Sequence, residues 1–412
     1  MAKPPLEGIR VADFTWVWAG PYCTLQLAHL GAEVIRVETR TRPCVTRMLP
    51  PWPDGTPGLN RSGYFNQYNQ GKRSLTLNFG KPGALEVARR LVERSDVVTN
   101  NFAAGVMDKL GLGYDDLRKI KPDIIMISLS GYGDTGPYRD YIAYGPAQVP
   151  LSGISALTGY KGWPPMHSGF SYADPNAGVH GAFAILAALY HRAKTGEGQF
   201  IDMSQWECAM DTTAEGLLEY SMNGREPERD GNRDRWMAPH GVFPSKDRPE
   251  IGGVAIDMWV SIVAADDGEW RRLAAAIGNP ELAADPRFAT LEARKQNEDA
   301  LEAIISAWTS ERNSAEAEAI LQAAGVAAAV CASNKSLAED EHLIGRNFFV
   351  ELEHPEVGVR KHAGIPWRMS DSESRVKSPA PAIGQHTEEV LRQILGYDEA
   401  EVGKLSEAGA LE

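Results

Sequence analysis

The sequence predicts an α/β protein with a parallel sheet, because strand-like and helix-like segments alternate along its first half. Its 412 residues exceed one ordinary core, so two domains, or one large domain with an inserted lobe, are expected. Residues 8–14 and 32–38 have the apolar, β-branched composition of buried strands. The segment between them, TWVWAGPYCTLQLAHLG, is typical of a loop followed by a helix. Pro21 suits the first turn of that helix and Gly31 its end, so these segments form one βαβ unit.

The alternation continues along the chain. Further strands are predicted at 74–79, 96–100, 123–131 and 200–204, with helices at 83–94 and 106–110. A longer helix is expected at about 176–194, and because its segment AFAILAALY is apolar on every side, we predict that it is deeply buried. Parallel strands joined by helices form a sheet that is covered on both faces, which makes this large domain Rossmann-like.

Changes in composition indicate the domain boundaries. Residues 1–223 are predicted to form the large domain, and 224–246, which contain REPERDGNRDR, a linker. Residues 247–347 are rich in helical patterns and are predicted to form a smaller α/β domain. Residues 348–412, strand-like and then Pro-rich before a helix at TEEVLRQILG, are expected to return to the large domain.

The composition excludes several classes of function. A formal net charge of −13 at pH 7 without a long basic block disfavours binding to nucleic acid or anionic lipid. No apolar run approaches the roughly 20 residues that a membrane span needs. The start, MAKPPLEGIRVADF, lacks the pattern of a signal peptide, so a cytoplasmic location is expected. Four widely separated cysteines favour neither a disulfide framework nor a zinc site.

Nucleotide and metal sites find no support. The first strand–loop–helix unit ends at Glu38, where a ribose-binding acid would stand, but its loop has one glycine instead of GxGxxG, so NAD or FAD binding is not expected. GxxxxGK[ST] and GxSxG are both missing. None of the nine histidines has metal-ligand spacing, so we expect no metal.

Asp174 is the candidate catalytic carboxylate. It precedes Pro175 at the predicted start of the long helix, and this local pattern by itself favours an N-cap. A helix N-terminus also favours the ionised form that a nucleophile must have, so the two roles are compatible. The small residues Ala177, Gly178 and Gly181 nearby suit either the approach of a ligand or close helix packing.

Seven blocks of the chain, in order, resemble the family III CoA-transferases, which include formyl-CoA transferase, carnitine CoA-transferase and, as a relative, α-methylacyl-CoA racemase. The blocks are LEGIRVADFTWVWAGPYCTLQLAHLGAEVIRVE, NQGKRSLTLNF, NNFAAGVMDKLGLGYDDL, LSGYGDTGPYRD, ADPNAGVHGAFAILAALYHRAKTGEGQFIDMS, WRRLAAAIGNPELAADPRF and GQHTEEVL. The resemblance implies an interlocked homodimer and CoA transfer between carboxylic acids. It also implies that Asp174 is the nucleophile, through mixed-anhydride and aspartyl-CoA thioester intermediates.

The resemblance also implies the residues that contact coenzyme A, the substrate-borne group of the acyl-CoA. By position in the motifs these are Trp16, Val17, Trp18, Ala19, Arg40, Lys72, Arg73, Asn101, Phe102, Lys109 and Tyr144. Arg and Lys side chains there would offset phosphate charges, and an aromatic ring would cover the adenine. These residues fall into three clusters at the expected carboxyl ends of the sheet strands, where ligands of α/β proteins bind.

Departures from the family pattern bear on the alternatives. Tyr144 stands where the racemases have their catalytic histidine, and a tyrosine with a pKa near 10 shuttles protons poorly at neutral pH. An acyl-CoA racemase or isomerase is therefore the weaker alternative. A non-catalytic CoA-binding subunit of a heteromer is the other, and the presence of Asp174 argues against it. Ala103 replaces an arginine of many members.

The aromatic content near Asp174 predicts the acceptor. Trp18 replaces a glutamine of formyl-CoA transferase, and four other aromatic residues are expected around the site: Trp16, Trp163, Phe170 and Tyr172. Large flat side chains favour a bulky acid, aromatic or dicarboxylic, over an oxalate-sized one, with succinyl-CoA as a candidate donor. The alternative is that these rings pack a domain or dimer interface.

Overall fold

The computed structural model describes residues 3–412, which form two compact units. The larger unit comprises 3–157, 166–227 and 347–412, so both ends of the chain belong to it. The smaller unit comprises 158–165 and 228–346. Within 3–412, no helix combines the length and apolarity that crossing a membrane requires.

A six-stranded sheet is the centre of the larger unit, and every pair of neighbouring strands is parallel. In spatial order the strands are β3 (Arg73–Thr76), β2 (Glu33–Glu38), β1 (Arg10–Asp13), β4 (Val97–Asn100), β5 (Ile125–Ser130) and β6 (Phe200–Ser204). The predicted parallel sheet is confirmed. The order reverses between β1 and β4, and the carboxyl ends of these two strands therefore flank the crevice where such sheets bind ligands.

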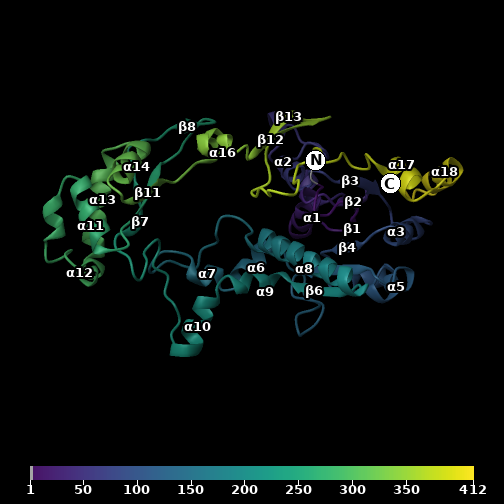
Figure 1. The fold of residues 1–412 in the computed structure, drawn as a ribbon, viewed down its shortest axis with the longest axis horizontal. Coiled ribbons are helices and arrows are strands. Elements are labelled where there is room, and N and C mark those ends of the chain that lie inside the picture. Colours follow the sequence, from purple (N-terminus) through teal and green to yellow (C-terminus); the bar gives the residue numbers. More distant parts are fainter. Residues whose placement is uncertain (1–2) are drawn as a thin grey trace. The chain divides into compact units, whose positions relative to one another are not determined.

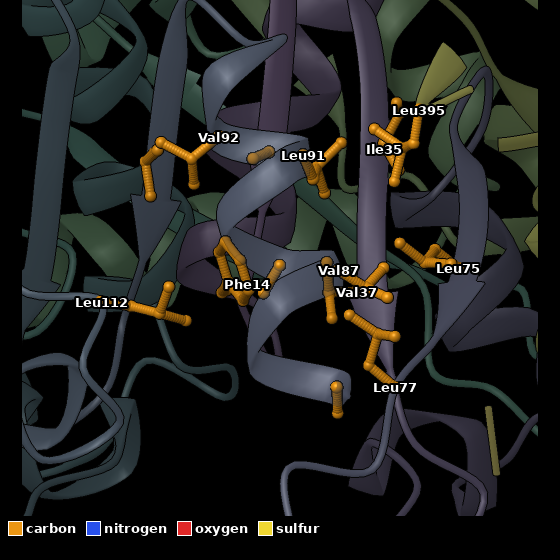
Figure 2. Packing of buried hydrophobic residues seen from close by; sticks show 14 of the residues in the cluster. Phe14, Ile35, Val37, Leu75, Leu77, Val87, Leu91, Val92, Leu112 and Leu395 are labelled. Atoms are coloured by element: carbon orange, nitrogen blue, oxygen red, sulfur yellow. The ribbon is translucent and has the colours of Figure 1, made fainter. Parts of the chain in front are cut away.

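One face of the sheet is covered by α3 (Ala84–Glu93) and by the end of the chain. Val87, Leu91 and Val92 of α3 are fully buried and pack with Val37 and Leu75 of the sheet (Figure 2). The remaining helices of residues 3–157 are α1 (Ala19–His29), α2 (Gly63–Tyr68), α4 (Val106–Lys109), α5 (Tyr114–Ile120), α6 (Gly145–Leu151) and α7 (Ile154–Leu157), with 3₁₀ turns η1 (Val45–Met48) and η2 (Pro53–Gly55).

The other face is covered by α1 and α8 (Ala173–Thr195), followed by α9 (Gln205–Asp211) and α10 (Ala214–Asn223). A side chain at Gly178 would meet the carbonyl oxygen of Ala19, and one at Gly181 would meet Cys23 and Leu129. These two glycines therefore serve close packing of α8 against α1 and the sheet.

Within the single chain the long helix is not buried on all sides, although the sequence predicts that it is. Val179, Phe183 and Tyr190 of α8 are 51%, 71% and 69% exposed, while Ala177 and Ile185 are fully buried. Alanine and glycine line the buried side because the helix lies close to α1, and the larger apolar side chains occupy the opposite side. The helix also begins three residues earlier than predicted.

The C-terminal segment, residues 347–412, belongs to the larger unit (Figure 1). It forms the hairpin of β12 (Phe349–His354) and β13 (Gly358–Ala363), then α17 (Thr387–Glu389), the π-helical turn η4 (Val390–Ile394) and α18 (Glu399–Glu407). Thr387 binds the backbone N–H and hydroxyl of Thr76, which attaches α17 to the edge strand β3.

The smaller unit has a three-stranded antiparallel sheet in the order β11 (Ala327–Val330), β10 (Trp259–Val263) and β7 (His240–Pro244). β7 lies inside the predicted linker 224–246, so the last part of that segment is not a linker. Its strand is short and ends in a proline, which concealed it. The other elements are β8 (Glu250–Ile251), β9 (Val254–Ala255), α11 (Asp267–Ala276), η3 (Pro280–Ala283), α12 (Leu291–Gln296), α13 (Glu298–Ser310), α14 (Ser314–Ala323), α15 (Asn334–Glu339) and α16 (Glu341–Gly345).

Candidate active site

Asp13, at the carboxyl end of β1, organises the loop that follows it. Its buried carboxylate accepts hydrogen bonds from the backbone N–H of Thr15 at 2.9 Å, the Thr15 hydroxyl at 2.5 Å and the Thr24 hydroxyl at 2.7 Å. Thr15 lies in the loop and Thr24 in α1. The carboxylate therefore fixes the start of the helix relative to the loop.

Lys72 belongs to the same buried network and does not reach a ligand cavity. Its ammonium group donates to the Pro21 carbonyl at 2.9 Å and the Thr24 hydroxyl at 2.7 Å, and lies 3.4 Å from Asp13. Burial lowers the pKa of this group to about 8, although the charge of Asp13 opposes the shift. The sequence predicts that Lys72 contacts a phosphate, whereas in the structure its ammonium group is hydrogen-bonded within the buried network that fixes the loop.

The loop after β1 is joined to the loop after β4 by a pair of hydrogen bonds. The Asn101 side chain accepts from the N–H of Trp16 at 2.7 Å and donates to the Trp16 carbonyl at 2.8 Å. Val17 then has φ 61°, a strained conformation for a β-branched residue. The loop reverses its direction at Val17, so Trp16 and Trp18 line two different cavities.

The first cavity, of about 620 Å³, lies at the carboxyl ends of β1, β2 and β4. Six residues that the sequence predicts line it: Trp16, Val17, Asn101, Phe102, Tyr144 and Asp174. The rings of Trp16 and Phe102 meet edge to face at 6.3 Å. The lining residues that were not predicted include Arg42 and Gln205. The guanidinium group of Arg42 lies 5.5 Å from the Trp16 ring centre.

The other predicted contacts lie outside this cavity. Arg40 donates to the carbonyl of Ile383, and Arg73 forms ion pairs with Glu33 and Glu389. Lys109 is exposed at the end of α4, while its neighbours Val106 and Leu110 line the cavity. Trp18 lines a second cavity, and Ala19 is buried beside Asp174. Arg42, two residues after Arg40, is thus the basic side chain that this loop turns toward the first cavity.

Asp174 lies in the first turn of α8, whose N-cap residue is Tyr172, so Asp174 does not hold the N-cap position that its local sequence pattern suggests. The residue is 7% exposed. Burial raises the pKa of its carboxyl to about 7, against the weaker effect of a hydrogen bond from the backbone N–H of Ala19. A buried carboxylate with one donor and a cavity in front of it is poorly solvated, which increases its reactivity toward a carbonyl carbon.

Two neighbours define the space around Asp174. Gly145, the first residue of α6, lies directly against the carboxylate oxygen Oδ2. Tyr64 of α2 is near enough that the negative charge of Asp174 adds to the effect of burial in raising the pKa of its phenol. Glu38, in contrast, is not available for chemistry, because Arg47 binds both its oxygens at 2.8 Å and lowers its pKa to about 2 despite burial.

The aromatic residues predicted around Asp174 are only partly brought together. The ring centres of Trp18 and Phe170 are 6.5 Å apart and those of Phe170 and Tyr172 are 5.9 Å apart. Trp163 belongs to the smaller unit. Two members of the group were missed: Tyr64 and Tyr68, whose ring centres lie 5.6 Å and 5.3 Å from that of Trp18.

Comparison with known proteins identifies related chains. Residues 6–387 match the family model described as CoA-transferase family III. Succinyl-CoA–D-citramalate CoA-transferase of Chloroflexus aurantiacus is 33% identical, with 97% of this chain and 96% of that protein covered. Succinate–glutarate CoA-transferase of Agrobacterium fabrum is 34% identical over 95% of this chain and 96% of its own, and formyl-CoA:oxalate CoA-transferase of Streptomyces avermitilis is 34% identical over 98% and 99%.

Two solved structures share the fold of this chain. The crystal structure of a CAIB/BAIF family protein from Brucella suis superposes with a TM-score of 0.86 at 32% identity, covering 96% of this chain and all of that one (100%). Rv3272 from Mycobacterium tuberculosis superposes with a TM-score of 0.78 at 27% identity, covering 94% of this chain and 99% of the other.

Proposed function

Because this chain belongs to the family III CoA-transferases and is an enzyme of that class, we propose that it moves CoA from an acyl-CoA to a carboxylic acid by covalent catalysis at Asp174. The observation that carries the proposal is the position of this carboxylate, buried and facing the cavity at the carboxyl ends of the parallel strands. The same cavity offers Trp16, Phe102 and Arg42 to the coenzyme.

The first half of the reaction loads CoA onto the enzyme. A carboxylate oxygen of Asp174 attacks the thioester carbonyl of the donor, which forms an acyl–aspartyl anhydride and releases CoA thiolate. The thiolate attacks the aspartyl carbonyl of the anhydride, forms an aspartyl-CoA thioester and expels the donor acid as its carboxylate. The N–H of Ala19, bonded to Asp174 in the resting enzyme, is placed to stabilise negative charge on the aspartyl oxygen.

The second half repeats these steps with the acceptor. Its carboxylate attacks the aspartyl thioester, giving a second anhydride and CoA thiolate, and the thiolate then attacks the acceptor's acyl carbon. The new acyl-CoA leaves and the Asp174 carboxylate is restored. Over the whole cycle one thioester and one carboxylate are exchanged for another thioester and another carboxylate, and no atom changes its oxidation state, so the balance needs no oxidant or reductant.

The acceptor is a bulky acid, aromatic or dicarboxylic, with succinyl-CoA as the donor. Trp18, Tyr64 and Phe170 near Asp174 support this assignment, since large rings favour a ligand with hydrocarbon to bury. One relative is named for succinyl-CoA and D-citramalate and another for succinate and glutarate, and these acids are dicarboxylic. Rates with aryl-substituted acids, with dicarboxylic acids longer than oxalate and with oxalate itself will rank the candidates, and oxalate as the best acceptor would oppose the assignment.

The enzyme acts as an interlocked homodimer. Apolar side chains exposed on α8 and α10 support this: Phe183 is 71% exposed, Leu217 57% and Met222 75%. A face of this kind is typical of a subunit interface. Interlocked chains cannot separate without opening, so dissociation must coincide with unfolding. Size-exclusion chromatography over a wide dilution range tests this, and a folded monomer would contradict it.

The test of the catalytic assignment is Asp174→Ala together with Asp174→Asn. Both variants should remain folded and bind CoA, while transfer from succinyl-CoA is lost, because the covalent route needs the carboxylate. Hydroxylamine added during turnover of the parent should label Asp174 by trapping the activated acyl group, as mass spectrometry of the peptide would show. Substantial transfer by Asp174→Ala would refute the mechanism.

A further inference from the structure

A second cavity, of about 700 Å³, lies in the larger unit on the other side of the reversed loop. Its apolar wall is made by Trp18, Pro51, Trp52, Tyr64 and Tyr68. The other wall comes from the C-terminal hairpin, which contributes Val357, Arg360, Lys361 and His362. This cavity is therefore built by segments separated by nearly 300 residues, and both walls belong to one compact unit.

This cavity adjoins Asp174, although Asp174 lines the first one. Trp18 contributes its side chain to the wall, and the N–H of the next residue, Ala19, binds the Asp174 carboxylate. Tyr64 contributes the neighbouring ring, and its phenol experiences the charge of the same carboxylate. One nucleophile thus stands between two cavities, which suits a reaction that must bring two different ligands to a single carboxylate.

The charges around the second cavity are of one sign. Among the described residues that line it, four are basic or titrate as bases, Arg61, Arg360, Lys361 and His362, and none is acidic. Arg61 is occupied by backbone carbonyls, those of Thr56, Glu356 and Pro53, and so holds the hairpin in place. The ring of His362 contacts Gln67.

Arg360 is the basic side chain best placed to bind an anion there. It is exposed, and one of its terminal nitrogens, Nη1, donates to the carbonyl of Val359 at 2.8 Å. The rest of the planar guanidinium group can present paired N–H donors to a carboxylate. In a chain with a net charge of −13, a cavity without acidic lining residues selects for anions.

We propose that the second cavity binds the acceptor as a dicarboxylic acid, with its hydrocarbon body against Trp18, Trp52 and Tyr64 and its non-reacting carboxylate at Arg360. The proposal rests on the CoA transfer at Asp174 and adds to it the place and the chemistry of the second substrate. The reacting carboxylate must reach Asp174, so a monocarboxylic acid of equal length would leave Arg360 without a ligand.

The test compares glutarate with pentanoate, two acids of the same chain length, in the parent enzyme and in Arg360→Gln. With succinyl-CoA as donor, Arg360→Gln should raise KM for glutarate at least about tenfold and leave that for pentanoate unchanged, since the substitution removes a charge-assisted contact with the second carboxylate. Arg368→Gln, an exposed arginine of the same segment outside the cavity, is the matched control and should change neither.

Binding gives a readout that does not depend on turnover. Calorimetric titration of glutarate and pentanoate into Asp174→Asn should show tighter glutarate binding that Arg360→Gln removes in the double variant. Equal affinity for the two acids, or an unchanged glutarate affinity after Arg360→Gln, would overturn the proposal. Loss of transfer in Asp174→Asn with either of these outcomes would leave the catalytic assignment standing and reject only the acceptor site.

Discussion

Gly145 lies so close to Asp174 that a methyl group at position 145 would overlap the carboxylate oxygen Oδ2 and would also meet the Cβ atom of Ser171. Gly145 has no left-handed backbone that would require glycine, so its role is spatial. The first residue of α6 therefore bounds the carboxylate on one side, while the N–H of Ala19 binds it and the first cavity lies open to it.

Replacing Gly145 by alanine should displace the Asp174 carboxylate and lower kcat by about a hundredfold, the loss that a shift of about 1 Å in a reacting group can cause. The variant should retain the parent melting temperature within a few degrees and its affinity for CoA. Gly403→Ala is the control, because nothing lies near a side chain at that position of α18. A kcat equal to that of the parent would show that the carboxylate is not positioned by this contact.

The pKa of Asp174 predicts the pH dependence of the reaction. Burial raises it to about 7, and only the ionised carboxylate can attack, so kcat/KM should fall about tenfold for each pH unit below 7 and level off above it. The measurement is kcat/KM for the acyl-CoA from pH 5 to 9, which reports the free enzyme. A profile that is flat between pH 5 and 7 would mean that Asp174 is ionised throughout and better solvated than its burial implies.

The same raised pKa couples Asp174 to stability. The folded-state pKa of about 7 exceeds the ordinary value of 3.8, so the folded protein binds the proton more tightly. This contribution to the free energy of unfolding is complete below about pH 4 and is lost as pH rises through 7. Asp174→Asn has no charge to bury, so its stability relative to the parent should increase between pH 4 and 8, by at most about 4 kcal/mol.

Denaturant unfolding of both proteins across this pH range measures the difference. The unfolding midpoint of the proposed homodimer would depend on protein concentration, so both proteins are compared at one concentration. If the difference in free energy of unfolding between the parent and Asp174→Asn did not change with pH, the pKa of the Asp174 carboxyl would not be raised by burial.

Much of the main sheet was predictable because its strands and helices are continuous local patterns. The segments at 83–94 and 200–204 match α3 and β6 within a residue. Short helices such as α2 and α6 were missed. They have six and seven residues, and Pro146 and Pro150 in α6 are poor helix signals. The exposed side of α8 was missed because composition does not show which side of an apolar helix meets the rest of its own chain.

The site was predictable where residues directly follow parallel strands, as Trp16 follows β1 and Asn101 follows β4, because these strand ends meet at one edge of the sheet. The sequence predicts Arg40 as the basic residue of this loop, whereas Arg42 lines the cavity. The direction of a side chain in a loop depends on tertiary contacts, here the hydrogen bond that Arg40 donates to the carbonyl of Ile383. The second cavity was not predictable, since the hairpin that completes it is distant in sequence from Trp18.

The buried network of Lys72 gives the last prediction. Replacing Lys72 by methionine removes the partner of the Pro21 carbonyl and the Thr24 hydroxyl and leaves the charge of Asp13 without its cation. Loss of one member of a buried pair should lower the free energy of unfolding by about 3–5 kcal/mol. Lys109→Met, at an exposed lysine that follows β4, is the matched control and should leave stability within about 0.5 kcal/mol of the parent.

A contact with CoA phosphate at Lys72 predicts a different pattern. If Lys72 bound a phosphate, Lys72→Met would raise KM for acyl-CoA while the free energy of unfolding stayed close to that of the parent. The reason is that an ammonium group whose partner is the ligand contributes little to the stability of the ligand-free protein. Chemical denaturation and acyl-CoA kinetics of the two variants separate the roles. We expect the large change in stability at Lys72, because all four polar partners of its ammonium group, on Asp13, Pro21, Thr24 and Asn69, lie within the folded chain.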